Sequence, residues 1–457
     1  MSERMPPRVW RVTLVTLAVC FIGACAPVGP DYVRPSAPVP AAYKEAGAHA
    51  SSGAQAAISA RWWEIYGDPV LDALVSQVAV SNQSLAASAA RVREAQALVQ
   101  VASGASVPAV SAGTLKSGRK NENDFGLGVS WELDLWGRIR RDVEAHRAAA
   151  DASADDLAAA TLSMQAQLVQ SYFALRQDDA LIVLLQRSAE ANDQWHRMVG
   201  NQYAQGQASS ANVAEALMRA STAQMQLADT RSARAQLEHA IAVMLGKAPA
   251  DFAIAPAAFD VQVPAIPAGV PATLLERRPD VAASERRMAA ASARIGVARA
   301  EALPTINLAA GIGILRGPTG TADVRAPLFT GGRLQAQAAN ASEAYNEAVA
   351  NYRQTVLDAF REVEDGLVIT STLSGAAELQ DRAAAAANES DRVTRNQYRE
   401  GVADYSAVVE AANASLDAGR GELQLRVRRL DASVNLIMAL GGGWSSPSPP
   451  VPEHRSP

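Results

Sequence analysis

Strict alternation of apolar and polar residues marks two short parts of the chain. Between Phe125 and Leu135 every odd-numbered residue is apolar, whereas every even-numbered residue is glycine, serine or acidic. Side chains of a β-strand point alternately to opposite faces, so this pattern predicts a strand with one apolar face. Residues 305–315 repeat the alternation, and a shorter strand-like stretch follows them. We therefore predict two β-hairpins, at residues 107–135 and 305–329.

Long stretches without proline flank both hairpins. After Pro108 the next proline is Pro249, and after Pro327 the next is Pro447. Proline breaks helix interiors, so these stretches can hold long uninterrupted helices. Apolar residues from Val70 onward recur at helical spacing. The predicted helical arms cover residues 70–103, 137–202 and 208–246 in the first half, and 272–302, 332–397 and 403–440 in the second.

The two halves carry the same landmarks in the same order. Each landmark recurs after 195 residues: Gly137 as Gly332, Tyr203 as Tyr398, Gly206 as Gly401 and Gly246 as Gly441. A constant offset over a whole half indicates an internal duplication. The predicted organisation is a first repeat at 70–248, a proline-rich connector at 249–271, a second repeat at 272–441 and a disordered tail at 442–457.

The first residues have the features of an export signal. Three arginines precede the apolar stretch from Val12 to Ile22, and small residues then lead to Cys25. We predict a signal peptide over 1–24, since the apolar stretch is too short to span a membrane. The sequence around Cys25 resembles a bacterial lipobox, which implies that 25–69 is an acylated, outer-membrane-sorted N-terminal segment. The alternative is an ordinary signal peptide followed by a chance cysteine.

Composition and charge exclude several classes of protein. Only 19% of the residues are charged and 5% are aromatic, which suits long, closely packed helices. The formal net charge of -5 gives no basic surface for nucleic acid. The five histidines are scattered singly, and neither a G-x-S-x-G motif nor a phosphate-binding loop is present. We therefore predict a protein that is not an enzyme, with no cofactor and no metal site.

The predicted hairpins supply too few strands to form a closed barrel from one chain. Open strand edges cannot face lipid, because their backbone groups would lack hydrogen-bond partners. Hairpins from several chains must then combine, and a trimer would give twelve strands, a workable even number. The alternative is a pair of soluble amphipathic hairpins.

Several motifs along the chain resemble those of TolC-like outer-membrane efflux factors. They are Trp62-Trp63, Asp68-Pro69, Glu132–Arg138, Arg277–Val281, Pro327–Arg333 and Phe360–Asp365. The match is nearest to the OprM-like or NodT-type lipoprotein branch and covers nearly all of the mature chain. It implies a mixed membrane α+β fold: a homotrimer with a twelve-stranded outer-membrane β-barrel on a twelve-helix periplasmic tunnel. It also implies two partners, a periplasmic adaptor (membrane fusion) protein and an inner-membrane pump, which is proton-driven in this branch.

The same resemblance assigns functions to two turns between long helices. In such proteins these turns meet the helical hairpins of the adaptor. The matching residues are Tyr203, Gly206 and Ala208 in the first repeat and Tyr398, Gly401 and Ala403 in the second. Glycine after a tyrosine at a helix end also fits plain helix capping, and both roles can hold together.

Just past these turns, related proteins narrow their tunnel with rings of aspartates and with tyrosine–arginine links. The first-repeat aspartate position is Asn212 here, and two second-repeat positions are Ala407 and Glu410. Our aperture candidates are therefore Asp404, Tyr405, Glu410 and Asn212. A threefold ring of carboxylates would favour cations. For each acid the alternative is a solvated helix face.

Taken with the resemblance, these features predict a passive outer-membrane exit duct for drugs or other toxic small solutes in a tripartite efflux system. Two alternatives stay open: a protein-secretion outlet of the same architecture, and a non-channel lipoprotein that tethers the outer membrane to a periplasmic partner. The tether explains Cys25 and the arms but leaves the amphipathic hairpins without a role.

Overall fold

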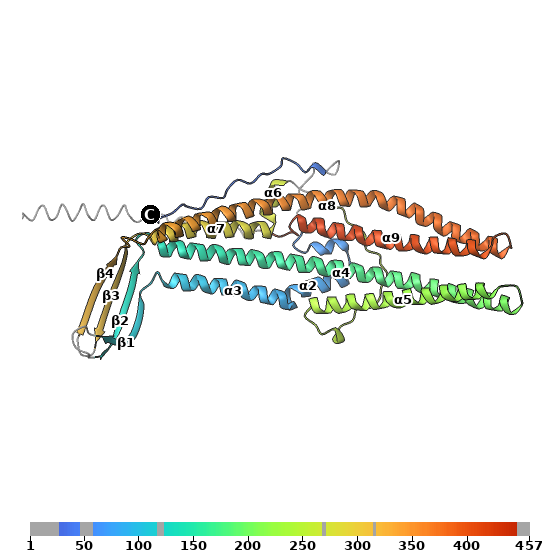
Figure 1. The fold of residues 1–457 in the computed structure, drawn as a ribbon, viewed down its shortest axis with the longest axis horizontal. Coiled ribbons are helices and arrows are strands. Elements are labelled where there is room, and N and C mark those ends of the chain that lie inside the picture. Colours follow the sequence, from blue (N-terminus) through green and yellow to red (C-terminus); the bar gives the residue numbers. More distant parts are fainter. Residues whose placement is uncertain (1–26, 46–57, 117–122, 267–270, 314–316, 446–457) are drawn as a thin grey trace, which may run out of the picture. The chain divides into compact units, whose positions relative to one another are not determined.

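The computed structural model describes residues 27–45, 58–116, 123–266, 271–313 and 317–445. The predicted signal peptide, Cys25 and most of the predicted disordered tail lie outside these residues. Within them, four strands and a set of helices follow one another in a repeated order (Figure 1).

The strands form one antiparallel sheet in the order β1-β2-β3-β4. They are β1 (Ala109–Lys116), β2 (Asn123–Leu133), β3 (Thr305–Gly313) and β4 (Gly317–Arg325). Each predicted hairpin thus forms, and β2 pairs with β3 to join the two hairpins, with Leu127 opposite Ile312. Figure 1 shows the four strands side by side.

Two helices dominate the chain, α4 (Arg138–Ala204) and α8 (Arg333–Arg399), each of 67 residues. At the usual rise per residue each is about 100 Å long. Each turns back into a 35-residue partner, α5 (Ser210–Met244) after α4 and α9 (Tyr405–Ala439) after α8. Equal helix lengths in the two halves reflect the duplication seen in the sequence.

The structure corrects the predicted arm over 70–103, which is two helices, α2 (Pro69–Ser81) and α3 (Gln83–Gly104). Asn82 separates them in an extended conformation. Its side chain accepts a hydrogen bond from the Leu85 N–H at 3.0 Å and donates to the Met244 carbonyl at 2.7 Å. Asn82 therefore starts a new helix while it binds the end of α5.

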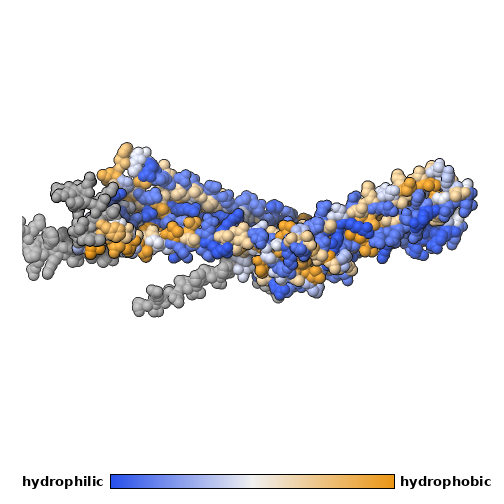
Figure 2. Space-filling view, turned by 90° about the horizontal axis from the view of Figure 1, so that it is seen from below, coloured by the Kyte–Doolittle hydropathy of each residue, from blue (hydrophilic) through white to orange (hydrophobic). Residues whose placement is uncertain are grey.

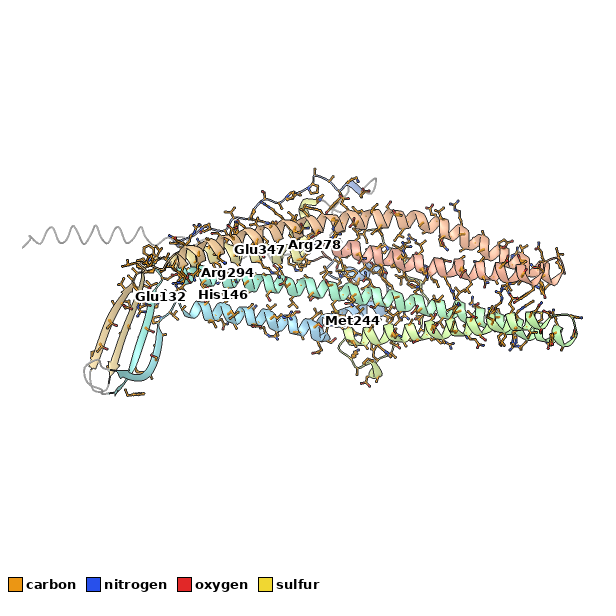
Figure 3. All side chains as sticks on the ribbon, in the orientation of Figure 1. Glu132, His146, Met244, Arg278, Arg294 and Glu347 are labelled. Carbon is orange, nitrogen blue, oxygen red and sulfur yellow. The ribbon has the colours of Figure 1, made fainter. Side chains whose placement is uncertain are left out.

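The predicted arm over 272–302 is likewise two helices, α6 (Pro271–Arg277) and α7 (Pro279–Ala300). Pro279 begins α7, and a proline disfavours the helical conformation of the residue before it, here Arg278. The guanidinium of Arg278, a residue labelled in Figure 3, donates to the Ala439 carbonyl at 3.0 Å and to the Glu362 carboxylate at 2.7 Å. The connector before α6 contains only the short 3-10 helix η3 (Pro249–Asp251).

The described chain divides into two compact units that do not follow the two repeats. Unit 1 comprises Met1–Pro38, Ser88–Leu157 and Pro279–Leu357; unit 2 comprises Val39–Ala87, Ala158–Arg278 and Asp358–Pro457. Each unit therefore takes segments from both halves of the chain, and α4 and α8 contribute to both.

Unit 2 contains the larger hydrophobic core. The 3-10 helix η2 (Trp62–Tyr66) places both tryptophans and Tyr66 in this core, where Tyr66 meets Phe173 edge-on with ring centroids 5.0 Å apart. The Trp62-Trp63 motif singled out in the sequence is thus a packing motif. In unit 1 a smaller buried cluster is made of alanines, with Ala148 of α4 against Ala289 and Ala290 of α7.

A buried ionic network fixes the connector to unit 2. Asp179, 5% exposed, accepts hydrogen bonds at 2.9 Å from both Arg176 and Arg234. The two arginines also donate to the carbonyls of Ala255 and Ile254 in the connector. Because every charge has its partner, the cost of burial is offset and the connector is held in place.

Candidate functional site

The two faces of the sheet differ sharply in polarity. One face carries apolar side chains that are open to solvent: Val110, Phe125, Leu127, Val129, Trp131, Leu308, Ile312 and Val324. Leu127, for example, is 53% exposed and Val324 is 62% exposed. Figure 2 shows hydrophobic residues gathered at the strand-bearing end of unit 1. A contiguous exposed apolar face of this kind indicates a surface that meets lipid or protein.

The opposite face is lined by small residues. Ser111, Ser130, Thr319 and Thr321 share it with glycines and with Ala309, and together they line a shallow hollow of about 280 Å³. In the described strands β1 pairs only with β2, and β4 pairs only with β3. The sheet therefore presents an apolar face, a small polar face and two edges with free backbone groups.

Residues 28–32 are fixed to the helix end of this sheet. The Val28 N–H donates to the Trp136 carbonyl at 2.9 Å, where β2 leads into α4. The buried Arg141 guanidinium binds the Asp31 carboxylate at 2.6 Å, and the Tyr32 hydroxyl donates to Glu285 of α7 at 2.6 Å.

The turns between the long helices have the same geometry in both repeats. Gly206 and Gly401 have φ values of 72° and 75°, in the left-handed region. The Gly206 N–H donates to the Tyr203 carbonyl, and the Gly401 N–H donates to the Tyr398 carbonyl. The following residue bonds in each case to the carbonyl five residues before it, which completes a Schellman motif. The capping role is therefore present at both turns, whereas contact with an adaptor stays a prediction.

Both turns are solvent-exposed. Tyr203 is 52% exposed, Gly206 and Gly401 are exposed, and Ala208 and Ala403 are partly so. A side chain at either glycine would meet no atom within 4 Å. The surface of each turn is thus open to a partner, and glycine is needed there for its backbone conformation alone.

Two aperture candidates take part in capping the N-termini of helices. Asp404 caps α9, because its carboxylate accepts from the Ala407 N–H at 3.0 Å and from the Ser406 hydroxyl at 2.9 Å. These two hydrogen bonds lower the pKa of Asp404 below its usual value, so this carboxylate is ionised at neutral pH. In the first repeat Ser209 caps α5 and Asn212 binds it, its N–H donating to Ser209 Oγ at 3.2 Å.

Tyr405 belongs to an aromatic cluster that links helices of the two repeats. Its ring stacks on Trp195 of α4, with centroids 3.6 Å apart and planes 4° apart, and Tyr398 meets Trp195 edge-on at 5.4 Å. Burial raises the pKa of Tyr405 to about 12, so its phenol stays neutral. Trp195 could not be recognised from the sequence, because its partners lie in the other repeat.

Glu410 lies one and a half turns into α9 and is exposed. Within the described residues its carboxylate has no hydrogen bond or ion pair, and it does not contact Asp404 or Asn212. Of the two acids among the four candidates, Asp404 caps a helix, whereas Glu410 has no such structural role.

Other kinds of site are missing from the described part of the chain. None of the helices described there is both long and apolar enough to cross a membrane. Nor does any group of three or more histidine, cysteine, aspartate or glutamate residues in that part have the geometry to hold a metal ion.

Comparison with known proteins identifies the family. The sequence profile of the outer membrane efflux proteins matches residues 74–247 and 270–442, which together make up most of the chain. The chain belongs to the outer membrane efflux protein family. The resemblance to TolC-like efflux factors is thereby confirmed.

Individual relatives agree with this assignment over nearly their full lengths. The chain is 31% identical over 432 residues to the pyoverdine export outer membrane protein OpmQ of Pseudomonas putida, covering 87% of this chain and 91% of the relative. It is 27% identical to the cation efflux system protein CusC of Escherichia coli, with coverages of 91% and 95%. Among solved structures, the outer-membrane channel OprN is similar with a TM-score of 0.82 and 27% identity, covering 91% of this chain and 99% of OprN.

These likenesses confirm the predicted role as an outer-membrane efflux channel protein and its location in the outer membrane. The family is one of channels rather than enzymes. Membership also favours the channel over the lipoprotein tether, because the tether leaves the amphipathic sheet without a function.

Proposed function

We propose that three copies of this chain form one channel. The sheet carries the proposal: its apolar face is exposed while both of its edges have free backbone groups. An exposed apolar face is unfavourable in water, and open strand edges are unfavourable in lipid, whereas closure of several sheets into a membrane-inserted barrel resolves both. Three four-stranded sheets make a twelve-stranded barrel with apolar residues outward and the small polar face inward.

The long helices would continue the barrel as a twelve-helix periplasmic tunnel. α3 supports this arrangement, because Leu85 and Ala102 alone among its residues are buried within one chain. A helix so little covered is typical of one that packs against a neighbour in an assembly. Leu98 and Val101, 45% and 72% exposed, would be covered by such a neighbour.

The duct would carry small solutes outward in a tripartite system, with an inner-membrane pump supplying energy through a periplasmic adaptor. Relatives are named for the export of pyoverdine, of toluene and of cations. Drugs or other toxic small solutes are therefore the proposed cargo. The adaptor would bind the exposed turns at Gly206 and Gly401, and the lipid on Cys25 would anchor the chain beside the barrel.

The aperture would lie at the turn end of the helices. The three Glu410 side chains of the trimer would form a charged ring, since Glu410 is an exposed acid of α9 with no local partner. Trp195, Tyr398 and Tyr405 would hold the two helical hairpins together when the aperture is closed. Asp404, as the cap of α9, and Asn212, bonded to the cap Ser209 of α5, would shape the same region.

Two measurements on the purified full chain test this function. The mass of the detergent-solubilised protein should equal that of a trimer, and planar bilayers should show discrete conductance steps. Glu410→Gln should reduce cation preference, whereas Glu410→Asp should retain it. A monomeric protein, or a membrane-inserted trimer that never conducts, would contradict the proposal.

A further inference from the structure

Two acids and an asparagine at the helix end of the sheet form a row across three strands. The strand register places Glu132 of β2 opposite Asn307 of β3, and Asn307 opposite Asp323 of β4. Residues in register on neighbouring strands point to the same side, so these three share the small polar face. Figure 3 shows Glu132 where β2 approaches the start of α4.

Each acid in this row has an arginine of its own. The Glu132 carboxylate receives Arg138 in a forked arrangement, with Nη2 at 2.9 Å from both oxygens and Nε at 3.1 Å from one. The Asp323 carboxylate receives Arg325 Nε at 2.7 Å. A third pair lies beside them, where Asp134 receives Arg140 Nε at 3.2 Å and the N–H groups of Ile139 and Arg140.

The next two rows on the polar face carry no charge, and the next acidic position on this face of β2 is Asp124 at its far end, opposite Leu115 of β1. The next rows toward the far end are Ser130, Ala309 and Thr321, and then Gly128, Gly311 and Thr319. Hydroxyls, methyl groups and bare backbone line the hollow there. The acid–base pairs on this face therefore lie where the strands meet the helices, and within each pair the charges balance.

We propose that Glu132, Arg138, Asp323 and Arg325 form a charge-balanced belt that lets the barrel pass solutes of either sign. The proposal rests on the proposed function, in which the polar face lines the pore. A ring of unpaired carboxylates would favour cations, and a ring of unpaired arginines would favour anions. Here each acid lies within a hydrogen bond of a base, so the two fields cancel beyond a few ångströms and neither kind of ion is repelled.

The positions of the two arginines also support the proposed belt. Arg138 begins α4, where the positive end of the helix dipole disfavours a cation. The ion pair with Glu132 accounts for an arginine at this position. The two side chains are similarly buried, at 31% and 29% exposed. Arg325 and Asp323 lie two residues apart on one strand and so point to the same side.

With this belt, the strand region and the helical aperture of the channel would have different roles in ion selectivity. Discrimination by charge would come from the helical aperture, and this belt would contribute none. The cargo class that fits such a barrel includes anionic, cationic and neutral small solutes, which suits a duct whose pump chooses the substrate.

The test is the reversal potential of single channels in a potassium chloride gradient. We compare the full-length wild type with Glu132→Gln, Arg138→Gln and the double variant. Glu132→Gln leaves an unpaired arginine and should shift the reversal potential toward anion preference. Arg138→Gln should shift it the opposite way, and the double variant should return to the wild-type value.

Opposite shifts that cancel in the double variant cannot arise from a merely structural role, which would change only the number of channels inserted. If the single variants conduct with the wild-type reversal potential, or shift in the same direction, the belt is overturned. Should either single variant fail to insert, Asp323→Asn and Arg325→Gln provide the same pair of tests. Those side chains are 50% and 79% exposed, so neither substitution disturbs a packed interior. A wild type without conductance steps would overturn the proposed channel itself, and the belt with it.

Discussion

Trp195 of α4 lies flat against Tyr405 of α9, with ring centroids 3.6 Å apart and an interplanar angle of 4°. The two residues come from different repeats, and each lies close to the turn that ends its own helical hairpin. The Trp195 Nε1 atom is buried without a hydrogen-bond partner, so the ring is held by packing alone. In this chain an aromatic stack joins the two hairpins where an aperture would have to open.

Loss of the Trp195 ring should make the channel open more readily. An aromatic pair is worth about 0.5–1.5 kcal/mol, so Trp195→Ala should raise the ratio of open to closed states about twofold to tenfold. Single-channel recording of open probability measures this ratio. Trp195→Phe is the matched control, since it keeps an aromatic face for Tyr405 and should stay near the wild type. An alanine variant with wild-type gating would show that the stack does not hold the closed state.

The turn glycines should resist substitution because of backbone conformation. Gly206→Ala and Gly401→Ala should each destabilise the protein by about 1–2 kcal/mol, the cost of a side chain in the left-handed region. Gly200→Ala is the control, since Gly200 lies within α4 and also has no atom within 4 Å of an added Cβ. That variant should gain about 0.5–1 kcal/mol of helix stability. Thermal unfolding followed by circular dichroism measures these stability changes. Equal effects at all three positions would show that the left-handed backbone conformation does not set the cost of substitution.

The sheet faces should differ in their tolerance of charge. Val129 and Ser130 are neighbours on β2 that point to opposite faces. Val129→Lys should cost about 2–4 kcal/mol of membrane stability if its face meets lipid, and the membrane-inserted fraction should fall. Ser130→Lys, which places the same charge on the inner face, should insert normally. Equal insertion of the two variants would mean that the apolar face does not lie in the bilayer.

Local pattern was enough to predict the hairpins and the long helices, for a physical reason. Alternation along 125–135 and the proline-free stretch before Pro249 are properties of a single element, so each can be read without knowing its neighbours. The breaks between consecutive helices were harder to predict from the sequence. Pro279 was visible in the sequence and its effect was underestimated, whereas Asn82 ends a helix by binding the Met244 carbonyl, which is distant in sequence.

The candidate site was predicted only in part for the same reason. The turn glycines carry their own conformational requirement and could be found from sequence. Trp195 could not, because its importance depends on Tyr405 in the other repeat. The pairing of Glu132 with Arg138 spans only six residues, yet its position on the polar face depends on the register between β2 and β3.

A buried carboxyl in unit 2 should make stability depend on pH. Asp431 of α9 lies beside the hydrophobic core, and its Oδ1 atom is buried without a hydrogen-bond partner. Burial alone raises the pKa of Asp431 to about 6. Between the ordinary aspartate pKa and this raised value, the folded protein holds a proton that the unfolded chain has lost. The free energy of unfolding should therefore fall as the pH rises through this range.

Asp431→Asn should remove the part of this dependence that Asp431 contributes, because an amide has no proton to lose and keeps the shape of the carboxyl; Asp155 and Asp178, whose pKa values are also raised to about 6, would keep their share. The variant should be more stable than the wild type at pH 7 and similar to it near pH 4. Asp381→Asn on the exposed surface of α8 is the control and should follow the wild type at both values. Thermal midpoints in detergent at several pH values between 4 and 7 measure the difference. If the Asp431 variant and the wild type lose stability in parallel over this range, the carboxyl is hydrated or paired in solution and carries no such penalty.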